Sequence, residues 1–168
     1  MSFTEIKKFI ITSNSAKETL SLGKRLGKLL EPKDNICLYG DLGAGKTCFT
    51  QGIAQGLGIV PEEYVRSSTF VLFNEYRGGR IPLYHFDFFR IEDLEEIIDI
   101  GFEEYLFSQG VTVVEWAEKF PDILPEERLD VGFWILDLNT RKIEISISHP
   151  EKRYTSLLTS FRESNKCE

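Results

Sequence analysis

Apolar and polar residues follow two rhythms along the chain, which together predict a mixture of strands and helices. Short apolar runs suit strands, whereas an apolar residue at every third or fourth position suits an amphipathic helix. The predicted strands cover residues 9–11, 35–39, 70–76, 81–88, 111–114, 129–136 and 142–148. The predicted helices follow the cap residues 12–15 as far as Pro32, and cover residues 48–57, 92–98, 102–107 and the stripe 154–161.

The segments between the strands indicate how some of them pair. The turn Arg77-Gly78-Gly79-Arg80 joins two predicted strands, and residues 137–141 join two others; both are hairpin signals. By contrast, the runs 35–39 and 111–114 are apolar almost throughout, as in strands that are covered on both faces. We therefore expect antiparallel hairpins around a buried, parallel centre.

Length and composition limit the class of protein. With 168 residues, of which 42% are hydrophobic, the chain can form the core of a single domain over residues 1–168, with a polar tail from about residue 162. Disordered, collagen-like and coiled-coil classes are excluded. The net charge of −7 disfavours direct binding to nucleic acid or to an anionic membrane. Three scattered cysteines, with neither a signal-like nor a membrane-spanning segment, predict a cytoplasmic protein.

The strongest chemical signal is a glycine-rich loop between a predicted strand and a predicted helix. Residues 40–47 match the phosphate-binding pattern G-x-x-x-x-G-K-[ST] at every fixed position. Glycines let backbone N–H groups turn toward an anion, and the following helix adds its positive end. The lysine supplies charge to the β- and γ-phosphates of ATP, and the threonine hydroxyl supplies a ligand for Mg²⁺. The ATP-binding residues expected here are Leu42, Gly43, Ala44, Gly45, Lys46 and Thr47.

The position of this loop completes the expected fold. A phosphate-binding loop between a buried strand and a helix is typical of nucleotide-binding α/β proteins. The expected fold class is α/β, with a three-layer, P-loop NTPase-like mixed sheet that has a parallel centre, antiparallel hairpins and helices on both faces.

Two carboxylates end predicted strands, which is where ligands bind in open α/β sheets. Glu115 follows the run 111–114 and is the first choice for the Mg²⁺ site, whereas Asp87 is expected to ligate metal through water or to orient a nucleophile. His85 shares a face of its strand with Asp87, so a polar network near the site is one interpretation, and a hydrogen-bonded structural role is the simpler one.

Four segments, in this order and size, are more specific than the loop alone. They are residues 40–47, 65–70, 84–90 and 114–116, the last three reading VRSSTF, YHFDFFR and VEW. Together they resemble the TsaE (YjeE) family, the P-loop ATPases of bacterial tRNA threonylcarbamoyladenosine biosynthesis. The resemblance implies an ATPase that joins the TsaD–TsaB pair and supports transfer of a threonylcarbamoyl group to adenosine beside the anticodon, without performing the transfer. It implies contact with tRNA only through these partners.

The resemblance also implies roles for individual residues near the triphosphate. Lys46 is similar in position to the phosphate-binding lysine of the family, and Thr47 and Glu115 to its Mg²⁺ ligands. Asp87 is similar to a residue implicated in catalysis. The expected catalytic set is therefore Lys46, Asp87 and Glu115, and the expected cofactors are ATP and Mg²⁺.

Further roles follow from the same resemblance. Trp116 is similar to a tryptophan beside the nucleotide. Ser67 and Thr69 lie in a segment similar to the loop that faces the γ-phosphate. Ser15 and Arg141 lie in segments similar to the walls of the base and ribose side.

Two other functions remain open at this point. A small-molecule P-loop kinase would share the loop, but it usually needs arginines on a mobile lid, and here only Arg77 and Arg80 flank a turn. A non-catalytic, ATP-gated scaffold would not need the two strand-end carboxylates. The acidic segment Glu92–Asp99, with Glu103 and Glu104, suits a solvated helix face or a docking surface for a partner.

Overall fold

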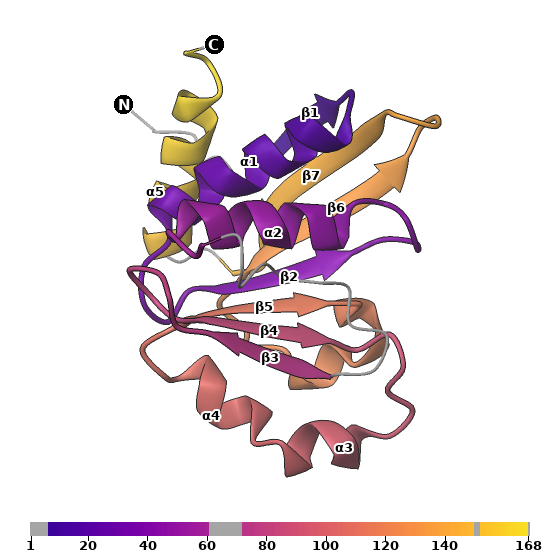
Figure 1. The fold of residues 1–168 in the computed structure, drawn as a ribbon, viewed down its shortest axis with the longest axis vertical. Helices are drawn as coiled ribbons and strands as arrows, with labels where there is room; N and C mark the ends of the chain where they lie inside the picture. The colour runs from indigo at the N-terminus through magenta and orange to yellow at the C-terminus, as the bar shows by residue number, and fades with distance from the viewer. Residues whose placement is uncertain (1–6, 61–71, 150–151, 168) are drawn as a thin grey trace.

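The computed structural model describes residues 7–60, 72–149 and 152–167, and within them a seven-stranded sheet runs through the molecule (Figure 1). From one edge to the other, the strands are β1 (Lys8–Ser13), β7 (Arg141–Ile147), β6 (Leu129–Ile135), β2 (Asn35–Tyr39), β5 (Val111–Glu115), β4 (Leu83–Asp87) and β3 (Phe73–Tyr76). Strands β6, β2, β5 and β4 are parallel, whereas β3–β4, β6–β7 and β1–β7 pair antiparallel. The predicted parallel centre and both hairpins are confirmed.

Helices cover both faces of the sheet, so the predicted three-layer α/β fold is also confirmed. Helices α1 (Ala16–Leu29), α2 (Lys46–Gly56) and α5 (Lys152–Ser164) lie on one face, and α3 (Leu94–Asp99) and α4 (Phe102–Leu106) on the other (Figure 1). Successive side chains of β2 point to opposite faces of the sheet, so Ile36 and Leu38 pack under α1 and α2 whereas Cys37 packs toward α3 and α4.

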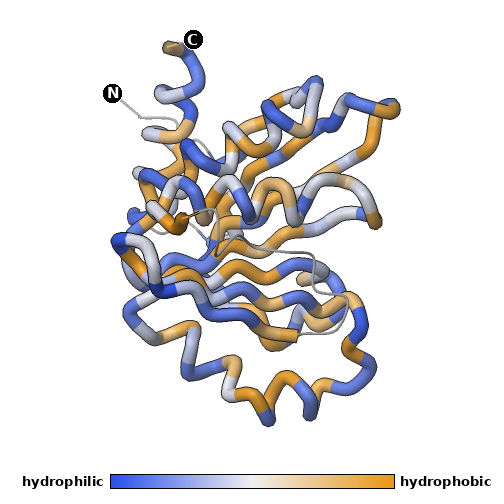
Figure 2. Tube along the Cα trace, in the orientation of Figure 1, coloured by the Kyte–Doolittle hydropathy of each residue, from blue (hydrophilic) through white to orange (hydrophobic). Residues whose placement is uncertain are grey.

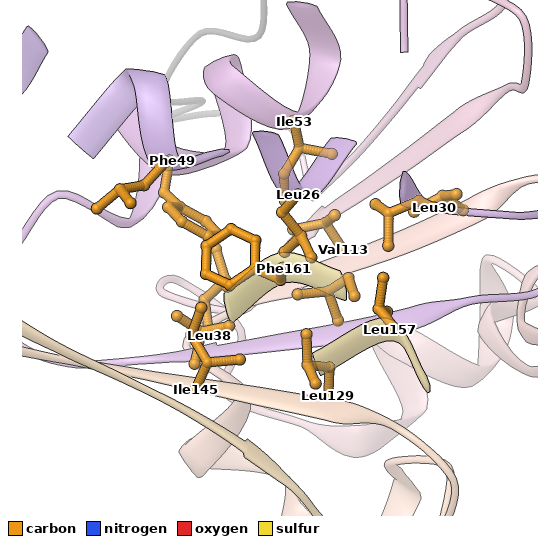
Figure 3. Packing of buried hydrophobic residues seen from close by; sticks show 14 of the residues in the cluster. Leu26, Leu30, Leu38, Phe49, Ile53, Val113, Leu129, Ile145, Leu157 and Phe161 are labelled. Atoms are coloured by element: carbon orange, nitrogen blue, oxygen red, sulfur yellow. The ribbon is translucent and has the colours of Figure 1, made fainter. Parts of the chain in front are cut away.

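Hydropathy follows this layering. Strands β2 and β5 are largely hydrophobic because both of their faces are buried, whereas β7 alternates because its burial does (Figure 2). On the α1–α2–α5 side, side chains from three helices converge on the sheet (Figure 3). Leu26, Phe49 and Phe161 are fully buried there, against strand residues such as Leu38 and Leu129.

Four glycines bring α1 and α2 into direct backbone contact. A Cβ atom on Gly23 of α1 would lie 2.2 Å from the Phe49 carbonyl oxygen, and one on Gly52 of α2 would lie 2.2 Å from the Leu20 carbonyl oxygen. Gly27 and Gly56 are equally crowded one turn further along. The pair of G-x-x-x-G patterns, which the sequence reading did not single out, therefore fixes how α2 sits against its neighbour.

Element ends differ from the predictions by a few residues. Helix α2 begins at Lys46, two residues early, because Gly45 with a φ of 107° ends the loop. Helix α5 continues through Ser164, beyond the end of the predicted stripe at Phe161. Each helix in the described part of the chain is too short or too polar to span a membrane.

Candidate nucleotide site

The glycine-rich loop lies at the carboxyl end of β2 and leads directly into α2. Gly40, Gly43 and Gly45 have φ angles of 143°, 78° and 107°, which other residues rarely adopt. At Gly40, a Cβ atom would also lie 2.6 Å from the Phe133 carbonyl oxygen on β6. The loop therefore needs these glycines, and it presents the amino end of α2, which favours an anion.

A cavity of about 440 Å³ opens beside the loop, a size that suits a small molecule such as a nucleotide. Its walls come from the loop and α2, from the ends of β4 and β5, and from the start of α1 with the β6–β7 turn. The predicted site residues that line it are Ser15, Leu42, Gly43, Ala44, Gly45, Lys46, Thr47, Asp87, Glu115, Trp116 and Arg141. Segments from most of the chain's length thus meet at one point.

Glu115, the last residue of β5, is 2% exposed and is the centre of a polar network. Its Oε2 atom accepts a hydrogen bond from the Thr47 hydroxyl at 3.0 Å, and its Oε1 atom accepts one from the Thr50 hydroxyl at 3.1 Å. The Nε2 atom of His85 lies 2.9 Å from the same Oε1 atom. Burial favours the neutral carboxyl, but the hydrogen bonds from His85, Thr47 and Thr50 outweigh it, so the pKa of Glu115 lies below its ordinary value. The group is therefore a carboxylate near neutral pH.

The Thr47 hydroxyl and the Glu115 carboxylate fit a magnesium ion. Both are hard oxygen ligands, they are in contact, and both residues line the cavity beside the phosphate-binding loop. Within the described residues, no group of three His, Cys, Asp or Glu side chains forms a metal site of its own. The Thr47–Glu115 pair alone provides the one or two protein ligands by which Mg²⁺ is commonly held together with phosphate oxygens.

Lys46 is 5% exposed, and its ammonium group lies within the loop. It donates hydrogen bonds to the Gly40 carbonyl and, at 3.0 Å, to the Asp41 carbonyl. Its Nζ atom also lies 3.9 Å from the centre of the Trp116 ring, in a cation–π contact. Burial lowers the pKa of Lys46, although surrounding carboxylates, Glu115 foremost, oppose the shift. The loop thus holds a buried cation at the cavity wall.

Asp87 ends β4 directly beside Glu115, its partner in the parallel register. One carboxylate oxygen accepts a hydrogen bond from the Phe89 amide at 2.9 Å, and the residue lines the cavity. Burial raises the pKa of Asp87, with the Phe89 hydrogen bond opposing and the Glu115 charge adding to the shift. Two adjacent carboxylates therefore have pKa values displaced in opposite directions.

Aromatic rings form the wall next to these carboxylates. Trp116 follows β5 with a φ of 58°, a conformation rare for a bulky residue. Its ring centroid lies 4.8 Å from that of Phe89, and both residues line the cavity. Trp116 therefore contacts both the Lys46 ammonium and the Phe89 ring at the cavity wall, and its partly buried ring also packs against the core on the α3–α4 side.

The opposite wall is built from a helix cap and a hairpin turn. Ser15 is the N-cap of α1, and its hydroxyl accepts a hydrogen bond from the Glu18 amide. Arg141 donates from Nη2 to the Gly43 carbonyl at 3.2 Å and from Nη1 to carbonyls of its own turn, including that of Asp137 at 2.8 Å. The arginine thus ties the β6–β7 turn to the phosphate-binding loop.

Comparison with known proteins decides the family. Residues 13–143 match the family model described as "Threonylcarbamoyl adenosine biosynthesis protein TsaE". The chain belongs to the TsaE family. The family predicted from the four sequence segments is therefore confirmed.

Relatives match over most of their length. The "tRNA threonylcarbamoyladenosine biosynthesis protein TsaE" of Bacillus subtilis is 47% identical over 115 residues, which are 68% of this chain and 70% of that protein. The protein of the same name from Treponema pallidum is 41% identical over 134 residues, 80% of this chain and 97% of the relative. The crystal structure of Bacillus subtilis YdiB has a TM-score of 0.78 and 33% identity, and the match covers 95% of this chain and 97% of that one.

Some expectations for this TsaE-family chain fall elsewhere. Ser67 and Thr69, predicted to face the γ-phosphate, lie outside the described residues. Thr50 was not predicted as part of the site, although it lies one helical turn after Thr47 and so on the same face of α2, which is the signal that could have found it. His85 was expected to be a hydrogen-bonded structural residue, and it is buried with its Nε2 atom 2.9 Å from Glu115 Oε1, within the polar network of the site.

The arginines that a kinase lid would need lie at the wrong end of the sheet. Arg77 and Arg80 precede β4, whereas Asp87 ends it at the site. Arg80 donates to the Gly27 carbonyl of α1 at 2.7 Å, and Arg77 pairs with Glu75. Both side chains are thus engaged at the amino edge of β4, away from the phosphate-binding loop.

Proposed function

We propose that this TsaE-family chain is the ATP-binding and Mg²⁺-dependent ATP-hydrolysing component of the machinery that forms N6-threonylcarbamoyladenosine in tRNA beside the anticodon. It acts with TsaD and TsaB and supports their cycle without performing the transfer. The observation that carries the proposal is the buried Glu115 carboxylate, which contacts the Thr47 hydroxyl beside a complete phosphate-binding loop. A scaffold that only bound Mg-ATP would need Glu115 for the metal but would not need a second carboxylate, Asp87, beside it at the cavity.

The loop and its neighbours would bind the triphosphate. The amino end of α2 and the Lys46 ammonium would attract the β- and γ-phosphates and would stabilise the negative charge that builds up on the β-phosphate leaving group during hydrolysis. Thr47 and Glu115 would hold Mg²⁺, which when bound neutralises phosphate charge. The hydrogen bonds from Thr50 and His85 keep the Glu115 carboxylate ionised and oriented.

Asp87 would orient the attacking water. It lies beside Glu115 on the neighbouring strand and lines the same cavity, so its second carboxylate oxygen can accept a hydrogen bond from water near the γ-phosphate. Its raised pKa makes the Asp87 carboxylate a better proton acceptor than that of an ordinary aspartate. Lys46, Asp87 and Glu115 are therefore the proposed catalytic residues.

The partner proteins would complete the site. Arg141 is the arginine among the described lining residues, and its guanidinium is occupied by backbone carbonyls. No cation of the described cavity wall other than Lys46 is thus positioned for the transferring group, so hydrolysis should be slow alone and faster with TsaD, TsaB and tRNA. The net charge of −7 suits tRNA contact through the partners, and a cytoplasmic location follows from that role.

The test is ATP turnover by the purified protein, with Mg²⁺, alone and then with TsaD, TsaB and tRNA. We expect slow release of free phosphate, stimulation by the complex, and loss of turnover in Lys46→Ala. Lys24→Ala, an exposed lysine of α1, is the matched control. Turnover by Lys46→Ala at the parental rate would exclude the loop as the active site. A phosphorylated small molecule in place of free phosphate would indicate a kinase, and tight ATP-dependent assembly without turnover would indicate a scaffold.

A further inference from the structure

A second cavity, of about 560 Å³, lies on the other face of the sheet from α1 and α2. Helices α3 and α4 line it together with the 3-10 turn η3 (Pro121–Ile123), and Figure 1 shows both helices at the far end of the molecule from α1 and α5. The floor of the cavity is formed by core residues, because Ile97, Phe102 and Leu106 are 1%, 3% and 5% exposed and belong to the hydrophobic core on this side of the sheet. We call this cavity and its rim the α3–α4 groove.

Large apolar side chains border the α3–α4 groove instead of filling it. Ile98 at the end of α3 is 62% exposed and Phe107 at the end of α4 is 70% exposed, and both line the cavity. Figure 2 shows hydrophobic and hydrophilic residues alternating along this part of the chain. Single exposed apolar residues are ordinary, but two of them at the edge of a hollow with an apolar floor form a surface that a partner can bury.

Charge is concentrated at the same place. Residues 91–110 contain seven acidic residues and no lysine or arginine. The chain has 27 acidic residues, so twenty lie elsewhere, which equals its number of lysines and arginines. The entire net charge of −7 thus lies in the segment that forms α3 and α4.

The acidic groups at the groove are available for a partner. Glu103, Glu104 and Asp122 line it, are exposed, and form no salt bridge among the described residues. The nearby cation Lys119 donates instead to the Phe89 and Ile91 carbonyls, at 2.8 and 2.6 Å. The rim therefore attracts positive charge, and it repels RNA and anionic lipid.

We propose that the α3–α4 groove docks a basic, amphipathic segment of a partner protein, with apolar side chains against Ile98 and Phe107 and lysines or arginines opposite Glu103, Glu104 and Asp122. An apolar floor with a rim of one charge selects both features in the same ligand. The inference does not depend on ATP hydrolysis, because the groove shares no lining residue with the nucleotide cavity.

The probe is a fluorescein-labelled, helix-forming peptide of about 18 residues made of leucine and lysine, with leucine on one face. A scrambled peptide of the same composition and a peptide with glutamate in place of lysine are the ligand controls. Fluorescence anisotropy is measured with the full chain at low and at physiological salt. We expect saturable binding of the amphipathic lysine peptide that weakens with salt, and weak binding of both control peptides.

Variants locate the binding on the molecule. The double variant Ile98→Ser/Phe107→Ser should bind the peptide with an affinity at least about tenfold lower than that of the parent, because two apolar contacts are lost. Ile10→Ser, a 52% exposed isoleucine on β1, is the matched control and should bind as the parent does. Glu103→Gln/Glu104→Gln should lower both the affinity and its salt dependence, whereas Glu163→Gln on α5 should change neither. ATP binding by each variant, followed through Trp116 fluorescence, should equal that of the parent.

Several results would overturn the proposal. Equal binding of the scrambled peptide, or full binding by Ile98→Ser/Phe107→Ser, would show that the α3–α4 groove does not select an amphipathic ligand. Sedimentation that reveals a dimer of the parent chain, abolished by the same double variant, would assign the groove to a second copy of this chain.

Loss of ATP turnover with intact peptide binding would count against the proposed function alone.

Discussion

Placing a methyl group between α1 and α2 tests whether close backbone contact positions the phosphate-binding helix. In Gly23→Ala, the new Cβ would lie 2.2 Å from the Phe49 carbonyl oxygen and 3.1 Å from the Gly52 Cα atom. Ordinary contact begins at 3.4 Å, so the helices must separate by roughly 1 Å. Both neighbours are helix backbone, which cannot turn aside as a flexible side chain would.

Two effects of this substitution oppose each other. Alanine in place of glycine favours an isolated helix by about 1 kcal/mol. Overpacking a tight interface costs about 1–3 kcal/mol, and a contact with backbone belongs at the upper end. We therefore expect a net loss of about 1–2 kcal/mol in the free energy of unfolding, or a fall in Tm of about 2–8 °C.

Urea unfolding of the purified protein measures the loss, and Lys24→Ala on the exposed side of α1 is the control. Because Phe49 lies on α2 one turn after Lys46, the same displacement should weaken ATP binding, which a nucleotide titration detects. A midpoint at or above that of the parent, with an unchanged m-value, would refute the reasoning, since helix propensity would then outweigh the contact.

Three further predictions concern the nucleotide site. The raised pKa of Asp87 means that its negative charge lowers the free energy of unfolding at neutral pH, so Asp87→Asn should raise the urea midpoint at pH 7 while reducing ATP turnover. The gain in midpoint should vanish as the pH falls through the pKa of Asp87 toward the ordinary pKa of an aspartate. An unchanged midpoint at pH 7 would contradict this prediction. Glu115→Gln places an amide N–H₂ where one oxygen now accepts hydrogen bonds, so Mg²⁺-dependent turnover should fall by about 100-fold or more in a phosphate-release assay, and near-parental turnover would exclude Glu115 as a ligand. In Trp134→Phe, Trp116 is the remaining tryptophan, and its fluorescence should change saturably with ATP; a flat titration beside calorimetric binding would place the nucleotide away from that ring.

The phosphate-binding loop and the strand-end carboxylates could be predicted from the sequence alone. The loop needs left-handed backbone at Gly43 and Gly45, where few residue types other than glycine are tolerated, so its motif can be recognised from the sequence before the fold is known. Strand periodicity then predicts that Asp87 and Glu115 each end a strand, and parallel strands place their carboxyl ends at one edge of the sheet. Both inferences depend on residues close together in sequence.

Tertiary structure alone decided how these groups are paired and charged. That Glu115 is ionised although buried follows from Thr50 on α2 and His85 on β4 reaching the same carboxylate, which no spacing along one segment reveals. The contact of Arg141 with Gly43 likewise joins residues 98 positions apart. The sequence by itself determined the fold class, the loop and the strand-end carboxylates, because turns and periodicity are local. The pKa shifts, the helix contact through glycines and the acidic apolar groove depend on the packing of distant segments, and only the folded chain brings those segments together.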